Sequence, residues 1–285
     1  MGVKVLTDST AYIPDSLLKK YDISVISLNI TLANNSIKEV HISNEEFYEL
    51  MKKNNKFPKS SQPSLDEITN KFEKNLKNGD DVVAVFISSE MSGTFSSAHL
   101  IKEVLLEKYP ERKIAIIDSR SNCMQMGLAV LEAAEKAMYG ASLEEVVNVC
   151  EDIKTKSKFL FTPETLDYLK MGGRIGSAGA LVGKVLKIVP ILTVLDGKTS
   201  VLEKVRTKSK AIEKILSIFL QDLKEKGLGK VIVHHINCEE EGIKLAERIK
   251  EKIDINTTVE VISIGPVIGA HVGPGAIGIA YHTKK

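Results

Sequence analysis

Three short segments rich in hydroxyl and carboxyl side chains each follow an apolar run, and together they could form a polar ligand site. They are Asp8-Ser9-Thr10, the stretch from Ser88 to Thr94, and Asp118-Ser119. If the apolar runs are neighbouring parallel strands, their carboxyl ends meet at one edge of a sheet, where open α/β sheets bind ligands. Each segment alone is also typical of an ordinary turn or helix cap, because Asp and Ser are favoured in both.

The turn Ser92-Gly93-Thr94 leads directly into a predicted helix. A helix N-terminus exposes unpaired N–H groups and the positive end of the helix dipole, so a carboxylate or a phosphate would fit here. The segment lacks the lysine of a P-loop and the spacing of a GxGxxG fingerprint. It therefore indicates an anion more than a nucleotide.

A second hydroxyl cluster, SSQPS, spans Ser60–Ser64. Pro63 disfavours helix at Gln62, so the residues before it are expected to be extended and could present Ser60 or Ser61 to a ligand. A polar loop that enters a capped helix explains the same residues equally well. The sequence alone does not decide between the two interpretations.

Two glycine-rich segments of the second half each hold one basic side chain. Met171-Gly172-Gly173-Arg174 ends a predicted helix, and Arg174 could bind an anion or a partner or simply follow the C-cap in solvent. The segment 265–278, GPVIGAHVGPGAIG, holds His271 in what we predict to be a tight loop able to form a backbone nest around a ligand. His271 is then a base, a hydrogen-bond donor or a structural support.

Ser92, His271 and Asp118 supply the residue types of a hydrolase triad, so a serine-dependent acyl hydrolase is an alternative function. The chain has no GxSxG elbow, and a triad is defined by a geometry that the sequence does not show. A metal site is not indicated. His234 and His235 are adjacent in a predicted strand and should point to opposite faces, and the three cysteines form no CxxC pair.

Composition is that of an ordinary globular protein long enough for two domains. The chain has 285 residues, of which 43% are hydrophobic and 27% charged, and its formal net charge is +2. This balance does not call for nucleic acid. There is no apolar run long enough for a transmembrane helix, and the scattered cysteines are typical of reduced thiols, so we expect a cytoplasmic protein.

Strands and helices alternate in the first half, which predicts a parallel sheet with helices on both faces. Continuous apolar runs at 3–7, 82–88 and 114–117 predict buried strands. Serines at positions 43, 64 and 142, each followed three residues later by glutamate, predict capped helices.

The second half has a different pattern. Strands are expected at 159–162, 231–234 and 259–264, with a hairpin around Asp196-Gly197 and a helix over 209–226. We expect an α/β fold of two α/β domains. The first, residues 1–157, has a mainly parallel sheet flanked by helices and carries the SQP and SGT loops. The second, residues 158–285, has a mixed sheet with helices and carries the GGR and HVGPG loops.

In their order and spacing these motifs resemble the DegV family of bacterial lipid-binding proteins over nearly the whole chain. The resemblance rests on TDST at Thr7–Thr10, SSQPS at Ser60–Ser64, SSEMSGTFSSA at Ser88–Ala98, DS at Asp118-Ser119, LDYLKMGGRI at Leu166–Ile175 and GPVIGAHVGPGAIG at Gly265–Gly278.

The resemblance implies a long-chain fatty acid such as palmitate or oleate, buried between the two domains without a cofactor or a metal. The residues it implies around the carboxyl group are Ser60, Ser61, Ser92, Gly93, His271 and Arg206. The supporting loop residues are Asp8, Ser9, Thr94, Asp118, Ser119 and Gly273. The family usually has threonine in place of Ser60, and serine keeps the hydroxyl but lacks the methyl group. Candidate tail-lining residues, each equally typical of ordinary core, are Phe161, Leu181, Leu186 and Ile188.

The resemblance also implies that the chain is a carrier and not itself an enzyme. It is similar to family members that serve as the acyl-carrying subunit of a bacterial fatty acid kinase. Such a carrier presents its fatty acid to a separate ATP-dependent kinase subunit, and the acyl phosphate formed feeds phospholipid synthesis. Arg174 is the candidate for docking this partner, and any contact with the membrane surface is expected to be transient. A lipid-sensing regulatory protein is a further alternative.

Overall fold

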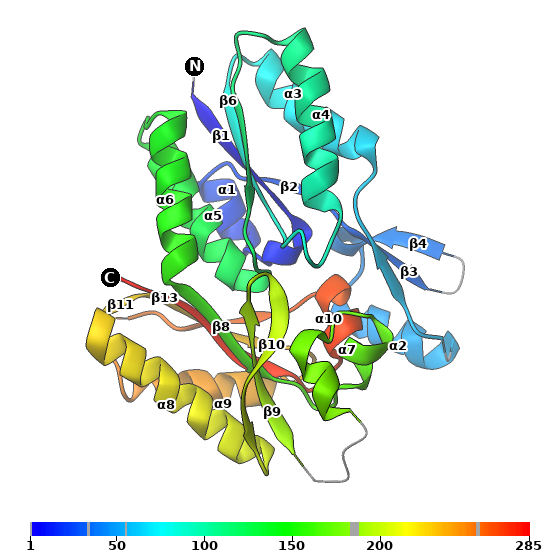
Figure 1. Cartoon of the computed structure of the whole chain (residues 1–285), viewed down its shortest axis with the longest axis vertical. Helices are drawn as coiled ribbons and strands as arrows, with labels where there is room; N and C mark the ends of the chain where they lie inside the picture. Colours follow the sequence, from blue (N-terminus) through cyan, green and yellow to red (C-terminus); the bar gives the residue numbers. More distant parts are fainter. Residues whose placement is uncertain (1, 33–34, 55, 183–187, 255–256) are drawn as a thin grey trace.

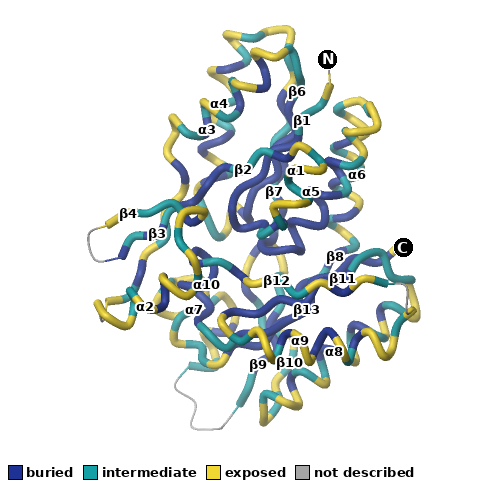
Figure 2. Tube along the Cα trace, turned by 180° about the vertical axis from the view of Figure 1, so that it is seen from behind, coloured by how far each residue is buried: buried dark blue, intermediate teal, exposed yellow. Residues whose placement is uncertain are grey.

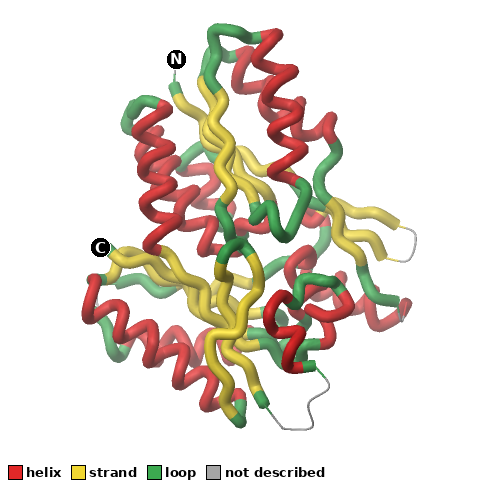
Figure 3. The backbone as a smooth tube through the Cα atoms, viewed as in Figure 1, coloured by secondary structure: helices red, strands yellow, loops and turns green. Residues whose placement is uncertain are grey.

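Layers of helix and sheet alternate in the molecule, and helices α3 and α4, the strands β1 and β6, and helix α6 lie side by side across its upper part (Figure 1). The computed structural model describes residues 2–285 except 33–34, 55, 183–187 and 255–256. From one end of the molecule to the other, the layers are helices α3 and α4, a parallel sheet, helices α5 and α6, a mixed sheet, and helices α8 and α9 (Figure 3). Because α5 and α6 contact both sheets, they join the two halves of the chain.

Sheet A is a four-stranded parallel sheet with the order β2-β1-β6-β7. Its strands are β1 (Val3–Asp8), β2 (Ser24–Ile26), β6 (Asp81–Phe86) and β7 (Ile114–Asp118). The central strands are buried because helices cover both faces, as their continuous apolar sequences predict (Figure 2). The carboxyl ends of β1, β6 and β7 therefore lie side by side at one edge of the sheet.

Sheet B is a small antiparallel sheet beside sheet A, with the order β4-β3-β5. Its strands are β3 (Asn29–Leu32), β4 (Asn35–Lys38) and β5 (Lys59–Ser61). The βα rhythm of the first half does not predict this sheet, because its strands are short and belong to no βαβ unit. It places Ser60, which pairs with Ile30 in the ladder, in an extended strand as Pro63 suggests.

Sheet C is a six-stranded mixed sheet formed by the second half of the chain, with the order β10-β9-β8-β13-β11-β12. Its strands are β8 (Ser157–Thr162), β9 (Val189–Leu195), β10 (Lys198–Val205), β11 (Leu228–His235), β12 (Glu260–Ser263) and β13 (Ile277–Thr283). Strands β9 and β10 form the predicted hairpin at Asp196-Gly197. The mixed α/β architecture expected from the sequence is therefore confirmed.

Three of the helices in the described part of the chain begin where serine caps predict, at Ser43, Ser64 and Ser142. The helices are α1 (Asp15–Lys20), α2 (Asn44–Asn54), α3 (Leu65–Lys77), α4 (Thr94–Lys108), α5 (Cys123–Met138), α6 (Leu143–Lys156), α7 (Asp167–Met171), α8 (Lys208–Lys226), α9 (Glu239–Lys250) and α10 (Pro266–Val272). Ser64 caps α3, and Ser142 and Glu145 form a complete capping box at α6.

The prediction that residues 265–278 form a tight loop is wrong for its first part, where the structure has helix α10. Pro266 occupies the first helical turn, where a missing N–H costs nothing. All seven residues of α10 are buried, so tertiary packing stabilises a helix that its glycines would weaken. The left-handed Gly273, with a φ of 85°, ends it.

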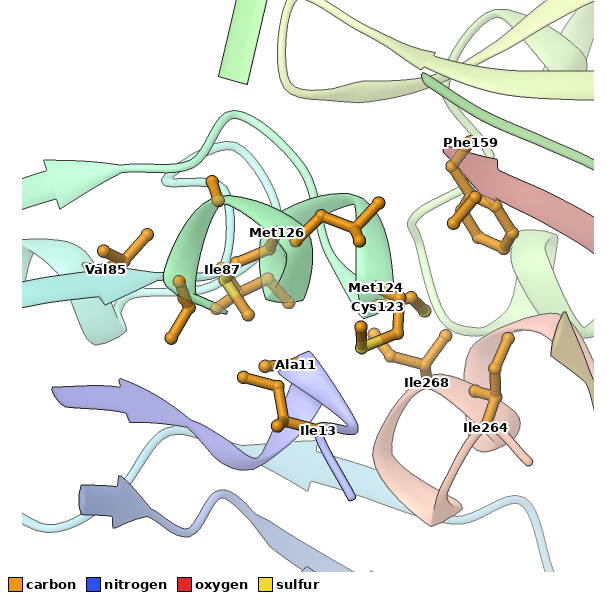
Figure 4. Close-up of a cluster of buried hydrophobic side chains, with 14 of the residues drawn as sticks. Ala11, Ile13, Val85, Ile87, Cys123, Met124, Met126, Phe159, Ile264 and Ile268 are labelled. Carbon is orange, nitrogen blue, oxygen red and sulfur yellow. The ribbon is translucent and has the colours of Figure 1, made fainter. Parts of the chain in front are cut away.

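The largest hydrophobic cluster draws its residues from both halves of the chain. Figure 4 shows Ile87 and Met124 of the first half together with Phe159, Ile264 and Ile268 of the second. Sheet C does begin at Ser157, close to the predicted boundary. The division into domains at 1–157 and 158–285 nevertheless stays a prediction, because the largest core cluster is shared by both halves, while each half also has a smaller cluster of its own.

Candidate functional site

A cavity lies between the two halves, at the carboxyl edge of sheet A. Its volume is about 620 Å³, including its opening to solvent, which is within the usual range for small-molecule sites. Its lining residues are Leu28, Ser60, Ser61, Gln62, Ile87, Met91, Ser92, Gly93, Asn122, Leu169, Arg174, Thr199, Val267, Ile268, His271 and Val272. The SQP, SGT and GGR loops and helix α10 thus meet here, although they are far apart in the sequence.

Ser60 and His271 form the central polar pair of this cavity. The Ser60 hydroxyl lies 2.7 Å from His271 Nε2, which joins strand β5 to helix α10. The other ring nitrogen, Nδ1, is buried and has no hydrogen-bond partner among the described residues. In the tautomer that avoids a buried N–H without an acceptor, Nδ1 is unprotonated and the proton is on Nε2. In this tautomer His271 donates to Ser60, and the Ser60 O–H is free to donate to a ligand.

Burial, followed by the charge of Arg174, lowers the pKa of His271 to about 4. The imidazole is therefore neutral at neutral pH, and it is a weak base. Gly172 packs closely against this side of the ring, because a Cβ at Gly172 would lie 2.1 Å from Nδ1. His271 is built as a neutral hydrogen-bonding group.

The SGT turn faces the same cavity as the start of a helix. Gly93 is the N-cap of α4. Because glycine has no side chain, Gly93 provides no side-chain cap for the first turn of this helix. The Ser92 hydroxyl lies 2.9 Å from the Thr94 hydroxyl and accepts the Thr94 N–H. Space for a side chain at Gly93 is taken by Gln62, because a Cβ would lie 2.2 Å from the Gln62 amide oxygen. This geometry fits an anion near Ser92.

Arg174 lines the cavity and crosses between the GGR and SGT loops. Its guanidinium donates to the Met91 carbonyl at 3.2 and 3.1 Å and to the Gly172 carbonyl at 2.8 Å. Neither partner is a carboxylate, so the positive charge of Arg174 is not neutralised by these contacts. The residue that we proposed for partner docking is thus also a charged group at the cavity wall.

A second, largely apolar chamber of about 350 Å³ adjoins the first. The two chambers share Asn122, Thr199, Ile268 and Val272 in their walls, and Phe159 and Phe161 lie in the second one. Asn122 is buried, and its Oδ1 has no hydrogen-bond partner among the described residues. The sequence analysis did not find Asn122, because it follows the DS motif without a signal of its own.

Several predicted loop residues support the site without lining the first cavity. Asp8 accepts hydrogen bonds from the backbone of Thr10 and Ile87, and burial raises its pKa to about 6. Ser119 bonds within its own turn to Ser121. Asp8 and Ser119 therefore act as ordinary turn and cap residues, which is one of the two interpretations that the sequence allows. Ser61, by contrast, does line the cavity, although it is exposed.

Arg206 is not brought to this cavity. It is exposed just beyond the end of β10, whereas Thr199 near the other end of the same strand lines both chambers. Seven residues of strand separate them, which is roughly 23 Å. Of the tail-lining candidates, Phe161 lies in the second chamber, Leu181 lines a separate surface pocket, and Leu186 lies outside the described residues. Ile188 precedes β9 and lines neither chamber.

The triad considered from the sequence is not assembled. His271 bonds to Ser60 through one ring nitrogen, and its other nitrogen has no partner in the part of the chain that the structure describes, so Ser92 and Asp118 do not bond to it. Asp118 instead accepts hydrogen bonds from Ser89 and from the Arg120 backbone. A neutral histidine without an orienting carboxylate is a poor general base, which disfavours serine hydrolase chemistry here.

Within the part of the chain that the structure describes, no group of three or more histidine, cysteine, aspartate or glutamate side chains could hold a metal ion. His234 accepts the Met124 N–H and donates to the Ile262 carbonyl, so it supports the fold between the two halves. None of the described helices is both long and apolar enough to cross a membrane.

The two halves, which enclose a cavity lined by serine hydroxyls with an apolar chamber behind it, define a protein of mixed α/β fold with a pocket of small-molecule size. The family model described as "Uncharacterised protein, DegV family" matches residues 2–284. The chain belongs to the DegV family. A DegV domain-containing protein of Clostridium acetobutylicum is 52% identical over 285 residues, covering 100% of this chain and 99% of the relative.

Two solved structures have the same fold. A stearic acid-binding protein of Eubacterium ventriosum superimposes with a TM-score of 0.90 at 29% identity, covering 99% of this chain and 98% of the other. DegV of Bacillus subtilis, described as a fatty acid binding protein, superimposes with a TM-score of 0.89 at 34% identity over 100% of both chains.

Proposed function

We propose that this protein binds one long-chain fatty acid, with the carboxyl group in the first chamber and the acyl tail in the second. The observation that carries the proposal is the Ser60–His271 pair, which leaves a hydroxyl proton free beside the Ser92 turn and above an apolar chamber. The fatty acids named for the solved relatives support the same ligand class.

Hydroxyls and a helix N-terminus hold the carboxyl group in this proposal. Ser60 and Ser92 donate O–H groups, and Gly93 leaves the N-terminus of α4 open to the ligand. Arg174 adds a positive charge at the wall. A hydrogen bond to a charged group contributes roughly 1.5–3 kcal/mol, so the head group sets orientation more than total affinity.

The acyl tail supplies most of the binding free energy. Burying a methylene group contributes about 0.8 kcal/mol, so about fifteen of them give on the order of 10 kcal/mol before the costs of association. Phe159 and Phe161 of strand β8 give the second chamber its apolar surface. Palmitate and oleate are the ligands we propose to test first.

Held in this way, the carboxylate lies near the opening between the SQP, SGT and GGR loops. We propose that the protein is a cytoplasmic carrier that presents this group to a separate ATP-dependent fatty acid kinase subunit, and that the acyl phosphate formed feeds phospholipid synthesis. Arg174 lies at this opening, and it is our candidate for contact with the kinase.

Mass spectrometry of the undenatured protein, followed by organic extraction, tests the ligand. Protein made in lipid-replete cells should carry close to one fatty acid per chain, and stripped protein should rebind palmitate or oleate. Recovery of no stoichiometric fatty acid together with no rebinding would overturn the proposal.

The carrier role has its own test, with purified kinase, ATP and limiting carrier. Ser92→Ala should reduce acyl phosphate formation, whereas Ser217→Ala, a change at an exposed position on α8, should not. Equal product from both variants would contradict the role of Ser92.

A further inference from the structure

Glu39 is a buried carboxyl group that the cavity itself does not use. It lies at the start of a short 3-10 turn after β4 and is only 5% exposed. The titratable groups that face it are Asp8 from β1, Tyr12 from the turn after β1, and Cys123 from the start of α5. Asp15 of α1 lines the pocket that Glu39 also lines, which is separate from the ligand cavity. None of these groups is a cation, so the position of Glu39 is not explained by an ion pair.

Three hydrogen bonds hold this carboxyl group between the two halves of the chain. The Ser9 hydroxyl donates to Oε2 at 2.5 Å, and the Tyr12 hydroxyl donates to Oε1 at 2.8 Å. The third donor is the backbone N–H of Val267, 2.8 Å from Oε1. Val267 belongs to α10, so Glu39 bonds directly to the helix that carries His271.

Helix α10 receives its N-terminal cap from the other half of the chain. Its N-cap, Gly265, has no side chain, and Pro266 has no N–H. The next two N–H groups are satisfied by Glu39, which accepts from Val267, and by the Tyr12 hydroxyl, which accepts from Ile268 at 3.2 Å. Without these partners both N–H groups would be buried and unpaired.

The backbone around this contact is shaped to allow it. A Cβ at Gly265 would lie 2.6 Å from the Tyr12 ring and 2.9 Å from Glu39 Oε1, so only glycine leaves room for both side chains. Tyr12 itself has a φ of 50°, in the left-handed region that is unfavourable for a bulky residue. Strain of this kind persists where surrounding contacts compensate for it.

Helix α10 also forms a wall of the ligand cavity along its length. His271 lies four residues after Val267, which is about one turn or roughly 6 Å of helix. Val267, Ile268 and Val272 line the first chamber beside it. A rigid helix of this length transmits any shift at its capped end to the Ser60–His271 hydrogen bond.

We propose that Glu39, assisted by Tyr12, is a positioning residue that caps α10 from the N-terminal half and thereby sets His271 against Ser60 for ligand binding. The ligand part of this inference rests on the proposed function. The geometric part does not, because it concerns a hydrogen bond present without ligand.

Two substitutions of Glu39 separate positioning from simple loss of a side chain. Glu39→Gln keeps an oxygen for Val267 and Tyr12, and Ser9 can turn its hydroxyl to accept from the new amide. Its affinity for palmitate at pH 8 should stay within about threefold of the wild type. Glu39→Ala removes the cap and should weaken palmitate binding about tenfold or more, which corresponds to the loss of one hydrogen-bonded cap. Glu73→Gln is the matched control, because Glu73 also accepts from a tyrosine hydroxyl but lies far from the cavity.

The titration of the His271 ring, followed by NMR in the empty protein, gives a readout that a purely structural role would not move. In the wild type and in Glu39→Gln the pKa of His271 should stay near 4. In Glu39→Ala it should rise toward the ordinary value of 6.5, because the ring leaves its buried position.

Each outcome bears on the proposal. Wild-type affinity in folded Glu39→Ala, or an unchanged His271 titration in that variant, would overturn it. If Glu39→Ala does not fold, Tyr12→Phe removes the acceptor for Ile268 and should show the same two effects more weakly, and no effect there would equally overturn the proposal. If the wild-type protein binds no palmitate, the proposed function is wrong. The titration of His271 still tests the role of Glu39 in that case.

Discussion

Ser60 is the residue whose chemistry defines the mouth of the cavity. Its hydroxyl accepts from His271 and has its own proton available, so its removal takes away a donor to the ligand and leaves His271 Nε2 buried without a partner. Ser60→Ala should therefore weaken palmitate binding about tenfold, in line with the loss of one hydrogen bond to a charged group.

Ser60→Thr is the conservative variant, and it should bind at least as tightly as the wild type, because the hydroxyl is kept. Isothermal titration with palmitate measures both, with Ser217→Ala as a control outside the cavity. An unchanged affinity in Ser60→Ala would show that the carboxyl group lies elsewhere.

Glu39 also predicts how stability depends on pH. Burial raises its pKa to about 7, above the ordinary value of 4.5. Between these values the folded protein holds a proton that the unfolded chain has lost, so this group makes the folded state less stable as pH rises from about 4.5 to 7. Glutamine cannot ionise. Glu39→Gln should match the wild type near pH 4.5 and exceed it at pH 8 by up to about 3 kcal/mol in free energy of unfolding.

Urea unfolding of the wild type and Glu39→Gln at several pH values checks this difference. The comparison between variants is needed because His234 and His271 have lowered pKa values near 4, and their contribution has the opposite sign. A difference that is constant across pH would mean that Glu39 does not titrate in this range.

Residue types with strong local chemistry were predictable, and residues defined by tertiary burial were not. Ser60, Ser92 and His271 belong to motifs, and the structure brings all three to one cavity. Glu39 lies in an ordinary polar stretch, NSIKEV, and only the packing of distant elements buries it. Arg206 is the opposite case, since its sequence neighbourhood carries no information on where β10 ends in space.

Helices α7 and α10 meet at Gly172, and this contact can be tested alone. Gly172 has a φ of −78°, which alanine adopts freely, so a substitution acts through space and not through backbone strain. A Cβ there would lie 2.1 Å from His271 Nδ1. Gly172→Ala should displace the imidazole and weaken palmitate binding about tenfold, with an overpacking cost of roughly 1–3 kcal/mol in stability.

Gly179→Ala is the matched control, because a Cβ at Gly179 meets only Ile175 at an ordinary 3.6 Å. It should leave both affinity and melting temperature close to the wild type. If the two variants bind palmitate equally, the position of His271 does not limit binding.

Elements with local signals were predicted better than elements made by packing. The serine caps place α3 and α6 correctly, because the signal lies in four consecutive residues. Helix α10 was missed since its glycines are typical of a loop, and its caps come from Glu39 and Tyr12. Sheet B was not predicted as a separate sheet because its strands are only three or four residues long, although the alternation over residues 23–31 predicts a strand that overlaps β3.

At the scale of the whole molecule, the shared core predicts cooperative unfolding. Ile87 and Met124 pack in one cluster with Phe159 and Ile268, so each half loses its part of the largest core when the two separate, although each also has a smaller cluster of its own. Calorimetry should show one transition, and palmitate should shift it upward because it binds only the folded state. Two separate transitions would support domains that fold independently on either side of Ser157.

Two buried cysteines, Cys123 and Cys150, allow the opening of this shared core to be measured over time. Burial raises the pKa of the Cys123 thiol well above its usual range and that of Cys150 to about 12, so neither reacts while it is enclosed. Cys123 lies near Ala11 of one half and Ile268 of the other (Figure 4), whereas Cys150 is buried within helix α6 of the first half. The rates at which a thiol reagent labels Cys123 and Cys150 therefore report two different opening events. Labelling of Cys123 ahead of Cys150 would record the halves parting while the rest of the chain stays folded, and that interval is the time during which an acyl chain can pass.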